Sequence, residues 1–205
     1  MAIKTFTVAI LLITAMATTF STCKKGGLGC VESSIFFNVD AKVYPDKDSV
    51  NIGDTIFVEV NIPTTLTDQN NNMVDYSKAS NLGTSMGFVK VVSDSPIVLN
   101  NAVPDFAFYL ISGKEIQSPN LQLYKDYFFQ EEAGRYLFKL AIIPKSSGTF
   151  RFNLENAGGV IRNGNPCPKA SFNFLLKNTT NQHYYLYPGG SGVTPAGADY
   201  YFYVR

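Results

Sequence analysis

Histidine and tryptophan are the scarcest residue types in this chain of 205 residues, which has one histidine, His183, and no tryptophan. A single histidine excludes every site that needs two, including most zinc sites and the metal-binding histidine pairs of hydrolases. The glycine-rich segment 190–192 also lacks the strand and helix that flank the serine of a nucleophile elbow. We therefore interpret His183 as a surface or packed residue, and we expect no catalytic residue, no metal site and no cofactor.

Neither positive nor negative charge is in excess. The chain has 17 Lys and Arg against 16 Asp and Glu, and no stretch of it is a basic stripe. Proteins that bind nucleic acids depend on clustered Lys and Arg to neutralise phosphates. The charge pattern therefore excludes a nucleic acid as the partner.

Long apolar runs are absent as well. The most apolar segment, 8–17, follows Lys4 and is shorter than the roughly 20 residues that a membrane-spanning helix needs. Small and hydroxylated residues continue it to Cys23, which is the layout of an export signal. We predict that residues 1–22 are a signal peptide that is removed.

Two cleavage positions compete at the end of this leader. Ala15 and Ala17 fit the small-x-small pattern of ordinary secretion, which would release a secreted or periplasmic protein. The segment 20–23, which reads FSTC, resembles in part the lipobox of bacterial lipoproteins. That resemblance implies acylation of Cys23, for example with palmitate, and a linker over 23–29. Lys24 after the cysteine resembles the pattern sorted to the outer membrane, in a leaflet that the motif leaves open.

The number of cysteines favours the lipoprotein interpretation. The chain has three, and an odd number in an exported protein leaves one thiol to explain. If Cys23 carries lipid, Cys30 and Cys167 can form a disulfide, as is common in oxidising compartments. Two buried free thiols are the alternative for this pair.

Alternating apolar and polar residues indicate β-strands. In 34–43 and in 55–62 every second residue is apolar, and the intervening positions include Asn38, Asp40, Lys42, Glu59 and Asn61. Further runs of this kind, bounded by Gly, Pro, Asn, Asp and Ser, bring the total to about nine strands: 86–92, 106–111, 121–129, 136–143, 149–154, 170–176 and 200–204. The sequence predicts an all-β fold with one domain over 30–205.

Two short motifs specify the architecture further. The segments 50–55, which reads VNIGDT, and 133–136, which reads AGRY, resemble immunoglobulin-like β-sandwich domains of bacterial surface proteins. The resemblance implies an antiparallel sandwich, with a tyrosine at a strand corner, and it transfers no functional residue. The segment 180–187 is expected to be a short helix or an irregular aromatic loop.

Tyrosines near the C-terminus are the candidate ligand-binding residues. Rings that face outward can stack on sugars or anchor a protein interface. The candidates are Tyr184, Tyr185, Tyr187, Tyr201 and Tyr203. The alternative is a last strand in which Tyr200, Phe202 and Val204 form the inner face while Tyr201 and Tyr203 cover the rim.

The segment 68–75 resembles the opening of a calcium loop, because oxygen-bearing side chains recur at alternate positions. Met73 replaces the glycine and Ala79 replaces the bidentate glutamate of an EF-hand loop. A polar hairpin is the better interpretation.

These observations predict a non-enzymatic lipoprotein, anchored in the outer membrane, with a binding or structural role at the cell envelope. Its expected partners are the membrane, through the N-terminal lipid, and an envelope protein or a glycan. The alternatives are a glycan-binding module of a polysaccharide-capture system and a secreted hydrolase that uses two carboxylates.

Overall fold

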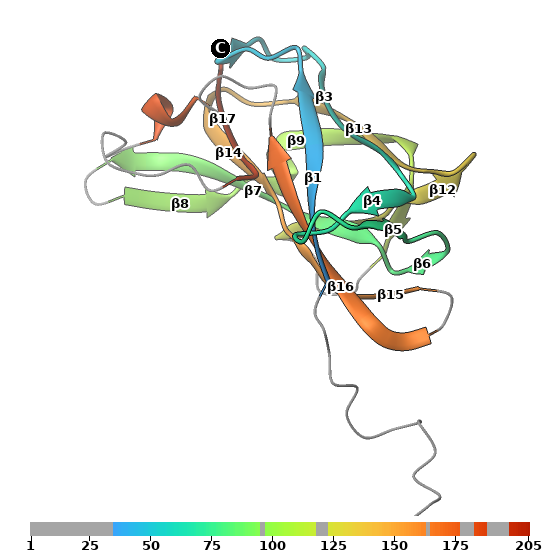
Figure 1. The fold of residues 1–205 in the computed structure, drawn as a ribbon. Coiled ribbons are helices and arrows are strands. Elements are labelled where there is room, and N and C mark those ends of the chain that lie inside the picture. Colours follow the sequence, from blue (N-terminus) through green and yellow to red (C-terminus); the bar gives the residue numbers. More distant parts are fainter. Residues whose placement is uncertain (1–34, 95–96, 118–122, 163–164, 177–182, 188–196) are drawn as a thin grey trace, which may run out of the picture. The chain divides into compact units, whose positions relative to one another are not determined.

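Two β-sheets make up most of the protein (Figure 1). The computed structural model describes residues 35–94, 97–117, 123–162, 165–176, 183–187 and 197–205. These residues contain seventeen strands, two turns of 3-10 helix and no α-helix, and the part of Ser33–Arg205 that they cover is one compact unit. The prediction of an all-β fold is confirmed.

The larger sheet has eight strands. Their order is β12-β13-β3-β1-β16-β15-β6, and β9 pairs with β13 beside β12. The bounds are β1 (Ile35–Tyr44), β3 (Ile56–Pro63), β6 (Ala79–Ser80), β9 (Phe106–Ser112), β12 (Gln130–Glu132), β13 (Arg135–Pro144), β15 (Ala157–Arg162) and β16 (Asn165–Leu176).

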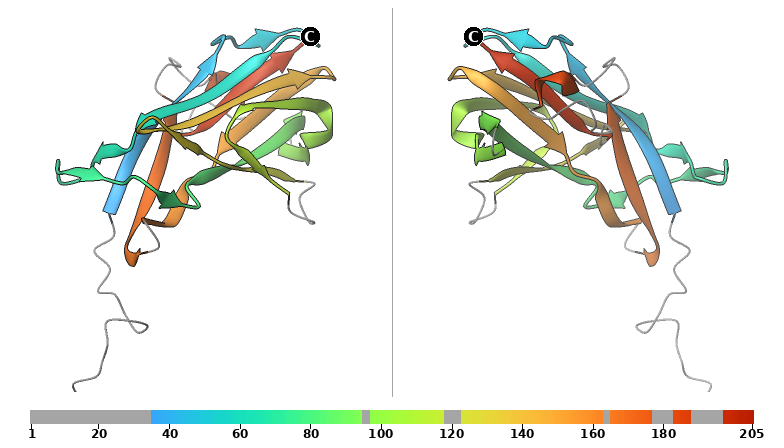
Figure 2. Two further views of the ribbon diagram at one scale, coloured as in Figure 1. Left: turned by 90° about the vertical axis from the view of Figure 1, so that its right-hand side faces the viewer. Right: turned by 90° about the vertical axis from the view of Figure 1, so that its left-hand side faces the viewer.

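The second sheet has seven strands in the order β10-β11-β7-β14-β17-β2, with β8 paired to β7. The bounds are β2 (Ser49–Val50), β7 (Gly83–Asp94), β8 (Ile97–Asn101), β10 (Lys114–Ile116), β11 (Tyr124–Phe128), β14 (Gly148–Leu154) and β17 (Asp199–Val204). The strands β4 (Thr65–Thr67) and β5 (Met73–Asp75) form a separate hairpin, which stands out beside the start of β1 (Figure 2). The 3-10 turns are η2 (Val103–Asp105) and η3 (Tyr184–Leu186).

The predicted alternation holds in the first long strands. Phe37, Val39, Ala41 and Val43 of β1 are buried, while the residues between them are exposed. The same pattern holds in β3, which pairs antiparallel with β1. Successive side chains of a strand point to opposite faces, so each sheet has one face toward the core and one face outward.

Aromatic rings fill the space between the sheets. Phe106 of β9 contacts Phe150 of β14, with ring centroids 5.0 Å apart in an edge-to-face arrangement. Tyr127 of β11 lies 5.2 Å from Phe138 of β13. These pairs cross from one sheet to the other, which makes the fold a sandwich with an aromatic core.

The sheets are mixed, which corrects the expectation of an antiparallel sandwich. β1 runs parallel to β16 (Figure 1). β17 runs parallel to β2. Alternation identifies a strand but does not specify the direction of its neighbour, because both pairings preserve the same two-residue period. Immunoglobulin-like topology stays a prediction.

The two segments that resemble immunoglobulin-like domains, 50–55 and 133–136, form turns next to strands. Ala133 and Gly134 both have positive φ, 48° and 73°, as a two-residue hairpin of type I′ between β12 and β13 requires. Tyr136 follows, and its hydroxyl donates to the Tyr76 carbonyl at 2.6 Å and accepts from the Ala79 amide at 2.9 Å. Tyr136 thereby fixes a segment about 60 residues earlier in the chain to the edge of the eight-stranded sheet.

Candidate functional site

The predicted tyrosines divide into buried and exposed groups. Tyr184 and Tyr201 are only 7% and 3% exposed, and their ring centroids lie 5.1 Å apart. Tyr187 packs edge-on against Tyr201 at 5.5 Å. Tyr185 and Tyr203 are 61% and 41% exposed. The five rings therefore do not form one open platform, because Tyr184 and Tyr187 make a second layer over Tyr201 on the outward face of β17.

His183 links this second layer to the sandwich. Its Nδ1 lies 2.9 Å from the Tyr201 carbonyl oxygen, and its Nε2 lies 3.5 Å from Asp46 Oδ1. The Tyr185 hydroxyl donates to the Asp48 carboxylate, which raises the pKa of Tyr185 to about 12 and lowers the pKa of Asp48. The segment 183–187 is thus held on the sandwich by packing and by two aspartates, which agrees with the interpretation of His183 as a packed residue.

The candidate calcium loop is a polar hairpin, as predicted. Oδ1 of Asp68 accepts hydrogen bonds from the backbone amides of Asn70 and Asn72, both at 2.8 Å. These amides lower the pKa of Asp68 and occupy its carboxylate within the loop between β4 and β5. Over the described ranges, no three His, Cys, Asp or Glu residues gather where they could hold a metal ion.

The predicted lipidation and disulfide fall outside what the structure describes. Cys23 and Cys30 precede its first described residue, and Cys167 belongs to β16 in a part whose side chains are not described. Both stay predictions. In the described part of the chain, no helix has the length and apolar character needed to span a membrane.

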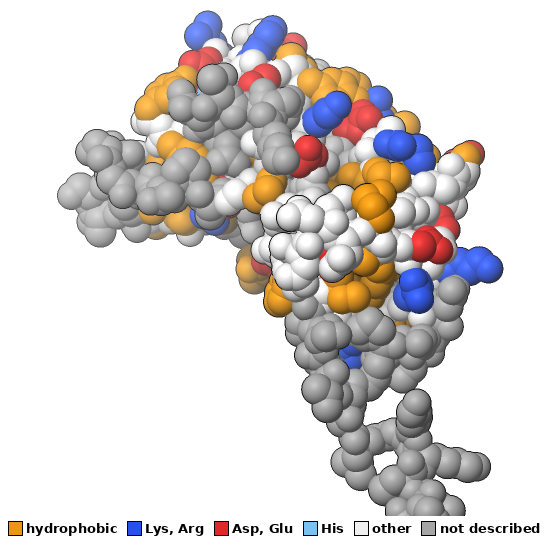
Figure 3. All heavy atoms as spheres, viewed as in Figure 1, with side chains coloured by type: hydrophobic (Ala, Val, Ile, Leu, Met, Phe, Trp, Pro, Cys, Tyr) orange, Lys and Arg blue, Asp and Glu red, His pale blue; other side chains and the backbone are white. Residues whose placement is uncertain are grey.

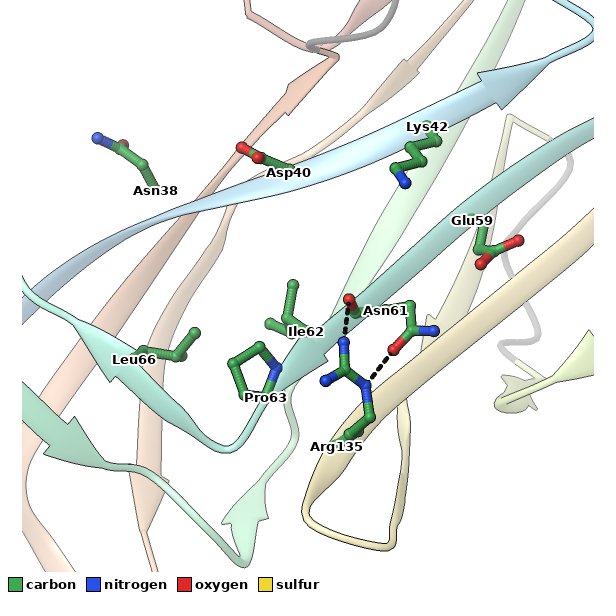
Figure 4. Close-up of a pocket in the computed structure, with 9 residues that line it drawn as sticks. All are labelled: Asn38, Asp40, Lys42, Glu59, Asn61, Ile62, Pro63, Leu66 and Arg135. Atoms are coloured by element: carbon green, nitrogen blue, oxygen red, sulfur yellow. Dashed lines mark hydrogen bonds between the residues drawn. The ribbon is translucent and has the colours of Figure 1, made fainter.

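A polar pocket of about 480 Å³ lies on the outward face of the eight-stranded sheet (Figure 4). Asn38, Asp40 and Lys42 occupy alternate outward positions of β1. The neighbouring β3 and then β13 add further polar groups, and the turn from β3 into β4 adds an apolar end. The remaining lining residues are Glu59, Asn61, Ile62, Pro63, Leu66 and Arg135.

Hydrogen bonds fix the orientation of the side chains at the β13 side of the pocket. Nε of Arg135 donates to Asn61 Oδ1 at 2.5 Å, and Nη2 donates to the Asn61 carbonyl at 2.9 Å (Figure 4). Arg135 is the first residue after the type I′ turn and stands opposite Pro63 in the register of β13 and β3. The turn therefore sets the position of the guanidinium group at the edge of the pocket.

A second network fixes Glu59. Its Oε2 accepts a hydrogen bond from the Tyr44 hydroxyl at 2.6 Å and lies 3.6 Å from Lys139 Nζ. The same Nζ lies 5.3 Å from the ring centroids of Tyr44 and Phe57, which stack on each other. The Tyr44 hydroxyl and Glu59 together raise the pKa of Lys139.

Opposite charges alternate across this face. Lys42, Glu59 and Lys139 stand directly opposite one another on β1, β3 and β13. Figure 3 shows basic and acidic side chains next to one another over these strands. The pocket itself contains two acidic residues, Asp40 and Glu59, and two basic residues, Lys42 and Arg135. Its formal charge is zero.

The alternation in the sequence predicted that most of the pocket residues lie between the apolar positions of their strands and so face away from the core. It did not predict that they meet in one site. The missing signal was register. Arg135 and Asn61 are 74 positions apart, and they meet because β13 pairs with the far edge of β3.

No protein-family model, no curated protein and no solved structure matches this chain. Its function is therefore inferred from the chemistry of its own residues.

Proposed function

We propose that this protein is a non-enzymatic binding protein of the bacterial cell envelope. In this proposal, lipid on Cys23 anchors the chain in the outer membrane, and the pocket on the outward face of the eight-stranded sheet is the binding site. One observation carries the choice of site: six polar side chains from three adjacent strands converge on one pocket. Sites built on strands hold their side chains more precisely than sites built on loops.

The existing bonds of the charged groups support binding rather than catalysis. Glu59 already accepts a hydrogen bond from Tyr44 and pairs with Lys139, and Arg135 already donates twice to Asn61. Groups held in this way are suited to present fixed donors and acceptors to a ligand, which limits the entropy lost on binding.

The anchor is tested by expressing the full chain with its leader in a Gram-negative host and labelling the cells with a palmitate analogue. The wild-type protein is expected to take up label and to partition into the detergent phase, whereas Cys23→Ala does neither. An unlabelled mature chain that begins at Thr18 overturns the anchor.

The binding site is tested by screening the full chain for ligands that raise its unfolding temperature, using neutral and charged oligosaccharides and peptides. Ligand-induced stabilisation is expected to disappear in the Asp40→Asn and Arg135→Gln variants. Glu115→Gln is the matched control, because Glu115 is an exposed carboxylate paired with Lys125 on the other sheet. A screen in which no ligand depends on the pocket contradicts the proposed site.

A further inference from the structure

We infer that the pocket on the eight-stranded sheet binds a neutral saccharide. This inference rests on the proposed function and adds the chemical class of the ligand. Three features of the pocket point to it: its balanced charge, its mixture of donors and acceptors, and its apolar end.

The charge balance excludes strongly charged ligands. A phosphate or a sulfated glycan placed against Lys42 and Arg135 would also face the carboxylates of Asp40 and Glu59. A cationic ligand placed against these carboxylates would also face the two basic side chains. Juxtaposed like charges in an interface oppose binding, so a ligand that contacts the whole pocket is neutral.

Donors and acceptors alternate over short distances in the pocket. Lysine and arginine only donate, the carboxylates only accept, and the amides of Asn38 and Asn61 do both. A hydroxyl group both donates and accepts, so a ligand rich in hydroxyls can satisfy every one of these groups. Planar guanidinium and carboxylate groups can also bond two neighbouring hydroxyls at once.

One end of the pocket is apolar. Pro63 is exposed there, and Ile62 and Leu66, which are buried in the core, lie next to it where β3 passes into β4 (Figure 4). The hairpin that carries Leu66 is fixed over the start of β1, because the Phe36 amide donates to Gln69 Oε1 at 2.6 Å. A sugar ring has an apolar face of C–H groups and a polar rim of hydroxyls, which matches an apolar end beside polar walls. The volume of about 480 Å³ lies within the range typical of small-ligand sites.

The backbone beside the pocket is paired on one side only. β1 pairs with β16 over 35–41, whereas its ladder with β3 covers only 41–44 against 57–60. Asn38 of β1 and Asn61 of β3 lie beyond that ladder, where the two strands diverge (Figure 4). Peptide recognition by strand addition needs strand backbone of this kind, which is outside a ladder on one side. A peptide is therefore the competing ligand, and the binding test includes peptides to separate it from a saccharide.

The test measures binding of the full chain to neutral gluco-, manno-, galacto- and xylo-oligosaccharides, to sulfated and uronic-acid oligosaccharides, and to unrelated peptides. We expect a neutral oligosaccharide to bind, with affinity reduced about tenfold or more in Asp40→Asn and in Arg135→Gln, since each removes a charge-assisted hydrogen bond. Its affinity should change little with added salt, because a neutral ligand is not screened. Glu115→Gln should bind like the wild type, and an unchanged unfolding temperature of each free variant shows that it is folded.

The other outcomes separate the two proposals. If a sulfated glycan or a peptide binds with salt-dependent affinity that these variants abolish, the pocket is the site and the saccharide assignment is wrong. If a neutral saccharide binds equally to wild type and variants, or if nothing binds, the pocket is not the site and both proposals fail.

Discussion

The outward faces of the two sheets differ in what covers them. On the eight-stranded sheet, outward residues of β1 such as Asp40 and Lys42 are exposed and line a pocket. On the seven-stranded sheet, Tyr201 of β17 also points outward but is buried beneath Tyr184 and Tyr187. Beside it, Arg151 lies 3.8 Å from Asp199, whose pKa is raised by burial. Alternation therefore sets the direction of a side chain, and a separate segment decides whether that side chain meets water.

The largest effect is expected from removing the buried ring of Tyr201. Tyr201→Ala should lower the free energy of unfolding by about 3 kcal/mol, because the contacts with two packed rings are lost and a cavity remains. Phe57→Ala, on the half-exposed outward face of β3, is the matched change and should cost about 1 kcal/mol. Urea denaturation measures both. Equal losses would mean that the second layer contributes no more than an open face.

The next largest effect is expected for Gly87, which lies on the outward face of the seven-stranded sheet, between the core residues Met86 and Phe88. A Cβ at Gly87 would lie 2.6 Å from Asn153 Oδ1 and 3.1 Å from the Tyr124 ring. Gly87→Ala should therefore lower the unfolding free energy by about 1 to 2 kcal/mol, since the crowded side chains must shift. Gly158→Ala is the control, because its Cβ would meet nothing within 4 Å. A neutral Gly87→Ala would show that Tyr124 is free to move away from the sheet.

A third effect is expected from alkaline pH. Burial raises the pKa of Tyr136 and Tyr200, and the bond to Asp48 raises the pKa of Tyr185 to about 12. Unfolded tyrosines lose their protons near pH 10. Above that pH the folded state therefore binds more protons than the unfolded state, so stability falls as the pH rises from 10 to 12.

Urea midpoints at pH 8 and pH 11 measure this loss. In Asp48→Asn, the pKa of Tyr185 should return toward 10 in an ultraviolet titration, while Tyr185→Phe removes that transition. A wild-type Tyr185 that titrates near 10 would mean that the Tyr185–Asp48 bond does not hold segment 183–187 in solution.

The smallest effect is expected on the outward face of the eight-stranded sheet. Glu59→Gln weakens the pair with Lys139, whose partners are partly exposed, and exposed pairs contribute little to stability. We expect a shift in the unfolding midpoint smaller than the three above, and one that shrinks further as NaCl is added. A large, salt-independent shift would show that the Tyr44–Glu59–Lys139 network is as important to the fold as the covered layer.

The main strands could be predicted because each is long enough to show its period. All nine predicted strands overlap strands of the structure, among them β1, β3 and β13. Most of the missed strands are short, such as β2 with two residues and β12 with three, or contain adjacent glycines, as β15 does. The five residues of β8, which read IVLNN, do not alternate. Two or three residues cannot show alternation, and glycine has no side chain to contribute to it. Their pairing depends on the neighbour already being in place.

The aromatic segment near the C-terminus was predicted only in part. The inward positions of Tyr200, Phe202 and Val204 agree with the alternative interpretation of the last strand. Tyr203 remains 41% exposed, and Tyr201 is covered by residues of 183–187 rather than standing at an open rim. The segment 180–187 was expected to be a short helix or an irregular loop, and its described residues, 183–187, contain the single 3-10 turn η3 over Tyr184–Leu186.

The sequence alone determined the fold class and the direction of the side chains along each long strand, because both follow from a period of two residues within a few positions. Only the tertiary structure decided which strands are neighbours, which of them run parallel, and which outward side chains are covered. Those outcomes depend on contacts between distant positions: Tyr185 reaches Asp48 across 137 residues, and Arg135 reaches Asn61 across 74. No local pattern encodes such pairs, because each one depends on which distant segments the fold brings side by side.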